Sequence, residues 1–211
     1  MPGPPAVRHL GATGRRAGGG RVADRDRAFC LREVGFWAWG PVLVVPLSSL
    51  TLARLRAAGL VESGPLGGGQ APWVWLTAKG ARTSGQGFCA WRMRPGLVAH
   101  TAAVNEVRLH IAARAPEGLW VCERQLAREL SRSQHLPDAM FCIDGQRHAI
   151  EVELTPKARA RTEAIVSELS ARHDVVVYFC APPAKRQLDD LAQTGAFPNL
   201  AVRDLPTGPM A

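Results

Sequence analysis

The stretch LPDAMFCIDGQRHAIEVELTPKARAR, residues 136–161, decides the fold of the C-terminal half of this chain. Two apolar runs flank Asp144 and Gly145, and Asp-Gly is a strong signal for a two-residue β-hairpin turn. Because successive side chains of a strand point to opposite faces, Glu151 and Glu153 project from the same face of the second run. The stretch therefore predicts a β-hairpin that carries two carboxylates on one face.

A third acid opens the first strand of this hairpin. Asp138 is expected to converge with Glu151 and Glu153 near one sheet edge, where three unpaired carboxylates would repel one another. A hard divalent cation such as Mg²⁺ removes that repulsion and can act on a phosphodiester. The alternative is that Glu153 is exposed to solvent and Asp138 only caps a turn, and the spacing alone does not choose between the two.

The surrounding sequence extends the hairpin into a mixed domain. A helix is predicted over 97–115, and Thr155 and Pro156 have the character of a helix N-cap and first helical position. The other expected elements are strands at 119–123, 138–143, 148–154 and 174–180, a short helix or loop at 125–131, helices at 157–171 and 185–194, and an edge strand at 200–204. Their order is α-β-β-β-α-β with a further α-β, which makes the fold class α/β or α+β.

The N-terminal half has a different pattern. A helix is expected within residues 25–39, a second over 48–58 with a stop at Gly59, and then two strands joined by a glycine-rich tip at 64–70. This order predicts a winged helix-turn-helix. The expected parts of the chain are a disordered arm (1–23), the winged helix (24–84), a linker (85–96), the α/β domain (97–206) and a tail (207–211).

The helix at 48–58 is the expected recognition helix of that winged helix. Its leucines are spaced to face the core, while four polar side chains are candidates for phosphate or base contacts in the major groove of DNA. These candidates are Ser49, Thr51, Arg54 and Arg56. The alternative is a winged helix that binds only protein.

Composition favours a polyanionic partner. The formal charge is +8, which raises the local concentration of nucleic acid or acidic lipid around the chain. The five cysteines form no C-x-x-C pair, so we expect reduced buried thiols instead of a zinc site or disulfide framework. No apolar run approaches a membrane span and the first residues lack a secretory signal, so a cytoplasmic protein is expected.

Three resemblances accompany these patterns. The string ARLRAAGLVES…VWLTAKG resembles the wing of many bacterial winged-helix DNA-binding domains, and Pro137-Asp138…Glu151-Val152-Glu153 resembles the PD-(D/E)XK nuclease motif. The wider strings HTAAVNEVRLHI, LPDAMFCIDGQRHAIEVELTPKARAR and VVVYFC are similar to the replication-relaxation family of plasmid and mobile-element proteins, over about residues 25–205. That family joins an N-terminal winged helix to a nuclease-like domain.

The resemblance implies roles for particular residues. Asp138 and Glu151 match the two metal-binding acids, whereas Glu153 stands where the motif has the lysine that helps to position the attacking water and neutralise charge. Lys157, four residues later, is a candidate to replace that lysine. Glu123 is a candidate additional acid, and His135 is interpreted as a structural or exposed residue.

Two main functions follow as hypotheses. The first is a Mg²⁺-dependent endonuclease or nickase that binds double-stranded DNA in plasmid replication, relaxation or transfer. A homodimer and other plasmid replication or transfer proteins are its candidate partners. The second is a non-catalytic replication accessory or transcription regulator with a degenerate nuclease fold. A third is a protein-interaction adaptor without DNA contact. A tyrosine relaxase is disfavoured because Tyr178 is the single tyrosine and lies in a buried strand, and no phosphate-binding loop of the ATPase type occurs.

Overall fold

A five-stranded mixed sheet forms the centre of the C-terminal half, in the computed structural model that describes residues 40–41, 49–65, 73–85, 90, 95–129 and 134–206. Its order is β4-β5-β6-β7-β8, with the first two pairings antiparallel and the last two parallel. The bounds are β4 Leu119–Cys122, β5 Ala139–Ile143, β6 Gln146–Glu153, β7 Val175–Cys180 and β8 Leu200–Asp204. The chain is therefore a mixed α and β protein, as expected.

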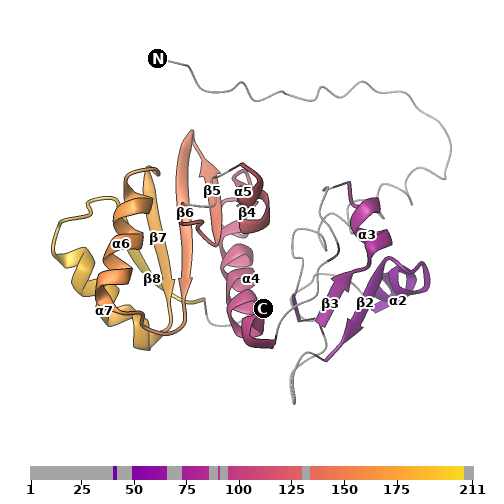
Figure 1. Ribbon diagram of the computed structural model, residues 1–211. Helices are drawn as coiled ribbons and strands as arrows, with labels where there is room; N and C mark the ends of the chain where they lie inside the picture. Colours follow the sequence, from indigo (N-terminus) through magenta and orange to yellow (C-terminus); the bar gives the residue numbers. More distant parts are fainter. Residues whose placement is uncertain are drawn as a thin grey trace.

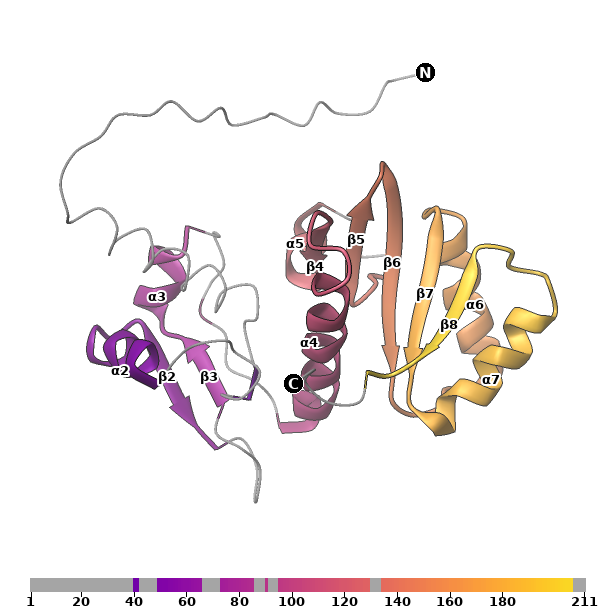
Figure 2. The same ribbon diagram turned by 180° about the vertical axis from the view of Figure 1, so that it is seen from behind.

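Helices cover both faces of this sheet (Figure 1). Helix α4, Val98–Ala112, lies on one face, and α6, Arg159–Ser170, and α7, Pro182–Gln193, lie on the other, as the view from behind also shows (Figure 2). A short helix α5, Glu123–Glu129, links β4 to β5. The order α4-β4-β5-β6-α6-β7 follows the predicted α-β-β-β-α-β pattern, and α7-β8 adds the further α-β unit.

The two cores follow the alternation of side chains along β6. Ile150 and Val152 are buried on the α4 face, together with Val107 of α4. Ala149 is buried on the opposite face, in a cluster that includes Leu169 of α6. Glu151 and Glu153 have the parity of Ala149, so their side chains leave the strand on the face that α6 and α7 cover.

The hairpin between β5 and β6 forms as predicted. Asp144 and Gly145 both have positive φ angles, 50° and 78°, which a two-residue turn of this kind requires. The register places Ala139 opposite Ile150 and Ile143 opposite Gln146. The turn thereby fixes which residues of the two strands face each other.

The described part of the N-terminal half contains a three-stranded antiparallel sheet and two helices. The sheet order is β1-β3-β2, formed by β1 Gly40–Pro41, β2 Val61–Gly64 and β3 Trp73–Leu76. Helix α2, Ser49–Ala57, packs Leu55 against Leu60, Val61 and Val74, with Leu52 partly buried beside them. The predicted helix, its core-facing leucines and the two strands after it are thus present.

Glycines explain how this small unit closes. Gly59 ends α2 with a φ of 65°, and Leu60 donates a hydrogen bond to the carbonyl of Leu55 at 2.9 Å. Gly80 lies in α3, Ala78–Thr83, where a Cβ atom would stand 1.9 Å from the carbonyl oxygen of Leu60. Only glycine permits this approach between α3 and the chain that follows α2.

Several predicted elements need correction or lie outside the described residues. Thr155 is not a helix N-cap: α6 begins at Arg159, because Ala158 still has a non-helical ψ angle of 133°. α7 begins at Pro182, three residues before the predicted start, since proline is tolerated at the first helical positions. The arm (1–23), the helix within 25–39, most of the glycine-rich tip (66–70) and the tail (207–211) lie outside the described residues.

The N-terminal sheet contacts the C-terminal half through α4. Trp73 of β3 and Val98 of α4 are buried against each other, with Trp75 and Ala102 partly buried around them. In the described ranges, none of the helices is long and apolar enough to cross a membrane. Of the five cysteines, Cys180 is buried and Cys122 and Cys142 are half-buried, and all three are free thiols.

Candidate functional site

Asp138 and Glu151 are brought together by the β5–β6 ladder. Since Ala139 pairs with Ile150, the preceding residue Asp138 stands opposite Glu151. The Asp138 Oδ2 atom accepts a hydrogen bond from the main-chain N–H of Val152 at 2.8 Å, which ties this carboxylate to β6. The predicted convergence of these two acids is therefore present in the structure.

Glu151 is deeply buried, with 5% of its surface exposed. Its Oε1 atom lies 3.0 Å from Nε2 of His135. Burial raises the pKa of Glu151 to about 7, with a further increase from the charge of Asp138, while His135 and Lys157 act in the opposite direction. A carboxyl group of this kind changes its protonation near neutral pH.

His100 contacts the other acid. It lies in the first turns of α4, and its Nε2 atom is 2.8 Å from Oδ1 of Asp138. This hydrogen bond raises the pKa of His100, against the effect of burial. Both oxygens of Asp138 thus have hydrogen-bond partners, one from α4 and one from β6.

Glu153 forms an ion pair with Lys157, the predicted replacement for the motif lysine. Only 8% of the Glu153 surface is exposed, so its interpretation as a solvent-exposed residue does not hold. The charge of Lys157 also lowers the pKa of Glu151, His100 and His135. Its partner Glu153 lies two residues after Glu151, on the same face of β6.

The predicted metal ligands can be compared with this geometry. Within the described ranges, no group of three or more His, Cys, Asp or Glu side chains is spaced to hold a metal ion as it stands. Asp138 and Glu151 nevertheless offer hard oxygen donors on facing strands, and Mg²⁺ is commonly held by one or two carboxylates with water and phosphate completing its shell. The donor chemistry of this pair fits Mg²⁺, whereas Glu153 is engaged by Lys157.

Glu123 lies at the rim of the same site. It is the first residue of α5, and its main-chain N–H donates to the carbonyl oxygen of Asp138 at 3.2 Å. Loss of solvent around its carboxylate and the charge of Asp138 raise the pKa of Glu123, although the residue as a whole is exposed. This proximity is consistent with its prediction as an additional acid.

Tyr178 and Cys180 lie behind the acids on β7. The register pairs Tyr178 with Glu151 and Cys180 with Glu153, so the four residues share one face of the sheet. Burial raises the pKa of Tyr178 far above its usual value, and burial and the nearby Glu153 raise the pKa of Cys180 to about 12. Neither group is therefore ionised at neutral pH, which argues against either as a nucleophile.

The predicted DNA-contacting residues lie on a separate element, α2. Arg54 and Arg56 are exposed and Thr51 is half-buried, while the side chain of Ser49 lies outside the described set. In both ribbon views α2 stands on the far side of the N-terminal sheet from α4 (Figures 1 and 2). The structure thus brings the acids together with Lys157 and places the candidate DNA contacts elsewhere.

Two histidines were not identified as site residues from the sequence. His135 was interpreted as structural or exposed, but it is half-buried and bonded to Glu151. His100 was not singled out, because 38 residues separate it from Asp138 and no sequence period connects the two. The position of His135 three residues before Asp138 was the one local signal.

Comparisons with known proteins add no assignment. A scan against protein-family models found no family that matches the chain, and a search of curated proteins found no similar sequence.

Proposed function

We propose that this chain is a DNA-binding protein whose C-terminal half carries a Mg²⁺-dependent site for phosphodiester cleavage, of the endonuclease or nickase type. The observation that carries this proposal is that Asp138, just before β5, stands opposite the buried Glu151 of β6, with Lys157 paired to Glu153 on the same face of β6. Two facing carboxylates and one adjacent cation are the parts that metal-assisted attack on a phosphodiester needs.

The element order supports a PD-(D/E)XK-like domain as the frame of this site. In that interpretation Asp138 and Glu151 hold the metal, and Lys157 takes the place of the lysine that Glu153 displaces. When bound, Mg²⁺ would polarise the phosphodiester and favour deprotonation of a water molecule. The Lys157 ammonium group would stabilise negative charge on the phosphate, and Glu153 would hold that ammonium group in place.

The distribution of charge supports DNA as the partner and the N-terminal half as the part that attracts it. Residues 1–94 contain 13 Lys or Arg and 4 Asp or Glu, a formal charge of +9. Residues 95–211 contain 13 Lys or Arg and 14 Asp or Glu, a formal charge of −1. The whole positive excess of the chain therefore belongs to the half that contains α2, and it would attract phosphate from solution.

The N-terminal elements are compatible with a winged helix that presents α2 to DNA. The order α2-β2-β3 and the pairing of β1 with β3 support this arrangement, and the exposed Arg54 and Arg56 would contact phosphates or base edges. Together with the nuclease-like frame, this supports a role like that of the replication-relaxation family, in the cytoplasm on plasmid or mobile-element DNA.

One observation favours a second function, a DNA-binding accessory or regulator without catalysis. Each acid already has its own basic partner, His100 for Asp138, His135 for Glu151 and Lys157 for Glu153. A site whose charges are balanced in this way can be stable without a metal. The same fold would then serve only to bind partners.

Plasmid nicking separates the two functions. Supercoiled plasmid is incubated with the protein and Mg²⁺ or Mn²⁺, and the wild type is compared with the shape-conserving variants Asp138→Asn and Glu151→Gln. We expect nicking by the wild type, its loss on addition of EDTA, and a decrease of about 100-fold or more in each variant, because each loses a carboxylate charge at the metal.

The matched control is Glu163→Gln, which removes a carboxylate of α6 whose side chain is 42% exposed and whose ion pair, within the described part of the chain, is with Arg159. It should nick like the wild type. Equal nicking by all four proteins would indicate a contaminating nuclease, and absence of nicking from a wild type that still binds DNA would favour the accessory function.

A further inference from the structure

His135 is held in place by the side chains of Glu168, in the last turn of α6, and Arg172, two residues after that helix ends. Its main-chain N–H donates to Oε1 of Glu168 at 2.8 Å, and its carbonyl oxygen accepts from Nη2 of Arg172 at 2.8 Å. Glu168 and Arg172 are themselves an ion pair, with 3.0 Å between Nη2 and Oε1. Both polar groups of the His135 main chain are therefore engaged by one acid–base pair.

The helix that carries Glu168 is firmly packed. Ile165, Val166 and Leu169 of α6 are buried against the sheet, so the turn that contains Glu168 has little freedom to move. From this fixed main chain the His135 imidazole reaches Oε1 of Glu151 at 3.0 Å. The contacts thus form a continuous chain from α6 through His135 to the buried acid of the site.

We propose that Glu168 and Arg172 form a positioning clamp, which sets the His135 imidazole on Glu151 and thereby fixes the orientation of that carboxylate beside Asp138. A carboxylate with one oxygen held in this way loses rotational freedom before it meets a ligand, which is how residues behind a metal ligand increase affinity. The effect of the clamp on metal affinity rests on the proposed function. Its effect on the position of the His135 imidazole does not.

The same helix provides a comparison for an ordinary ion pair. Arg159 and Glu163 have the same spacing, but their side chains are 64% and 42% exposed and touch no other segment in the described hydrogen bonds. Such an exposed ion pair contributes little to the stability of the fold. Arg172 is 23% exposed and bonds to a loop 37 residues away, so it performs a different role.

The first test follows the His135 imidazole in the full-length protein with EDTA present. In ¹H–¹⁵N NMR spectra, the Nε2–H proton of His135 should exchange slowly with water in the wild type, because Glu151 accepts its hydrogen bond. The signal is assigned by its absence in His135→Ala. We expect Arg172→Ala to abolish it and Arg159→Ala to leave it unchanged, with circular dichroism spectra of both variants like that of the wild type.

The second test measures Mn²⁺ affinity by calorimetry in the same proteins. We expect His135→Ala and Arg172→Ala to weaken binding by about 10–100-fold, and His135→Gln to restore most of the affinity, because its amide N–H can donate to Glu151. If Arg172→Ala fails to fold, Glu168→Gln replaces it, with a smaller loss in the same direction expected.

The outcomes separate the clamp from the proposed function. A slowly exchanging His135 proton in Arg172→Ala, or Mn²⁺ affinity in His135→Ala equal to or higher than that of the wild type, would overturn the clamp. A wild type that binds no Mn²⁺ would contradict the proposed metal site, and the NMR comparison of Arg172→Ala with Arg159→Ala would still decide the clamp.

Discussion

A buried carboxylate such as that of Glu151 loses the water that would otherwise stabilise its negative charge. Two groups compensate in part for this loss of water: His135 donates a hydrogen bond to the carboxylate, and the positive charge of Lys157 lowers its pKa. The negative charge of Asp138 acts in the opposite direction and raises the pKa of Glu151. The aromatic ring of Tyr178 backs it from β7. At the scale of single residues, the site therefore keeps an acid that gains or releases a proton near neutral pH.

The raised pKa of Glu151 should make the free energy of unfolding depend on pH, in the presence of a chelator that removes metal ions. The pKa of Glu151 is about 7 in the folded chain and 4.5 in the unfolded chain, so the folded state retains a proton that the unfolded state has released. The free energy of unfolding should therefore fall as pH rises from about 4.5 to about 7. His135, whose pKa the bond to Glu151 raises, adds to the fall in the upper part of this window.

Glu151→Gln removes the ionisable group and should remove most of this decline. We expect the variant and the wild type to be equally stable near pH 4.5, and the variant to be more stable above pH 7 by up to about 3 kcal/mol. Urea unfolding in EDTA at the two pH values measures the difference. Glu163→Gln is the exposed control, and a Glu151→Gln effect that is the same at both pH values would refute the assigned pKa.

At the scale of elements, local patterns predicted the strands and the turn but not the contacts between distant segments. The Asp144-Gly145 turn and the alternation along β6 were readable because turn chemistry and side-chain period are local properties. The predicted Thr155 cap was wrong, since α6 begins only at Arg159 and Lys157, before the helix, pairs with Glu153. The contact of His100 with Asp138 could not be predicted, because only the packing of α4 against the sheet creates it.

Gly80 allows α3 to pack closely against the main chain at Leu60. In Gly80→Ala the new methyl group would collide with the Leu60 carbonyl oxygen, 1.9 Å away, so α3 would have to move from the end of α2. We expect a loss of about 3 kcal/mol in the free energy of unfolding, or failure of the N-terminal unit to fold. Urea unfolding followed by tryptophan fluorescence measures it, since Trp73 is buried in this unit.

Gly96→Ala is the matched control for this substitution. Among the described residues, apart from its chain neighbours, no atom lies within 4 Å of a Cβ built at Gly96, so the variant should unfold like the wild type. If Gly80→Ala is as stable as the wild type, the close approach of α3 to Leu60 is incorrect.

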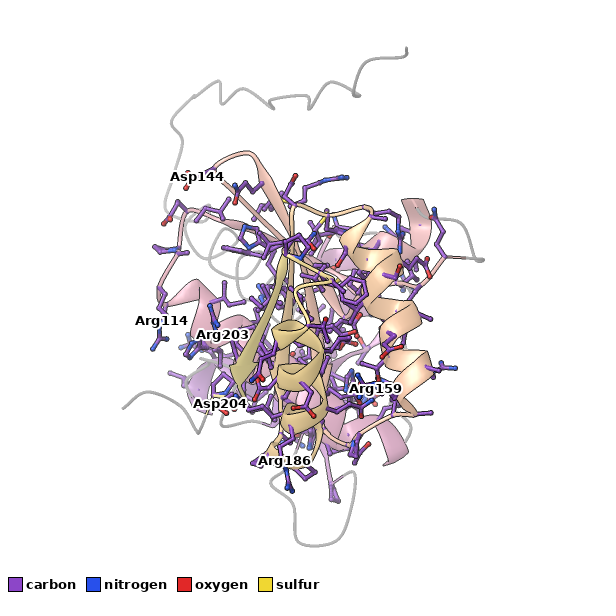
Figure 3. All side chains as sticks on the ribbon, turned by 90° about the vertical axis from the view of Figure 1, so that its left-hand side faces the viewer. Arg114, Asp144, Arg159, Arg186, Arg203 and Asp204 are labelled. Carbon is purple, nitrogen blue, oxygen red and sulfur yellow. The ribbon has the colours of Figure 1, made fainter. Side chains whose placement is uncertain are left out.

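At the scale of the whole molecule, charge is divided between the two halves. Charged side chains of the C-terminal half are dispersed around its periphery, as Arg114, Asp144, Arg159 and Arg186 show in Figure 3. Both signs are represented among them. The two halves meet where Val98 packs against Trp73, in the same part of α4 that carries His100.

This division predicts where DNA binding can be weakened. Arg54→Ala/Arg56→Ala should weaken binding to duplex DNA and reduce the slope of log K against log salt by about 1–2, since up to two phosphate contacts are lost. Arg159→Ala/Arg161→Ala removes the same formal charge from α6 and should change the slope little. Fluorescence anisotropy over a series of salt concentrations measures the DNA affinity and the salt slope of both double variants. A larger effect of Arg159→Ala/Arg161→Ala would indicate that the C-terminal half contains the DNA-binding surface.

The tight turn at Asp144 and Gly145 also has a kinetic consequence. Only 14 residues separate Asp138 from Val152, so a hairpin that can close within microseconds aligns Asp138 with Glu151. His100 lies 38 residues from Asp138 and must wait for α4 to dock, a step that has to overcome a larger loop entropy. During folding, the two acids would thus face each other before the imidazole of His100 arrives, and a high concentration of divalent cations could speed this stage by screening their repulsion.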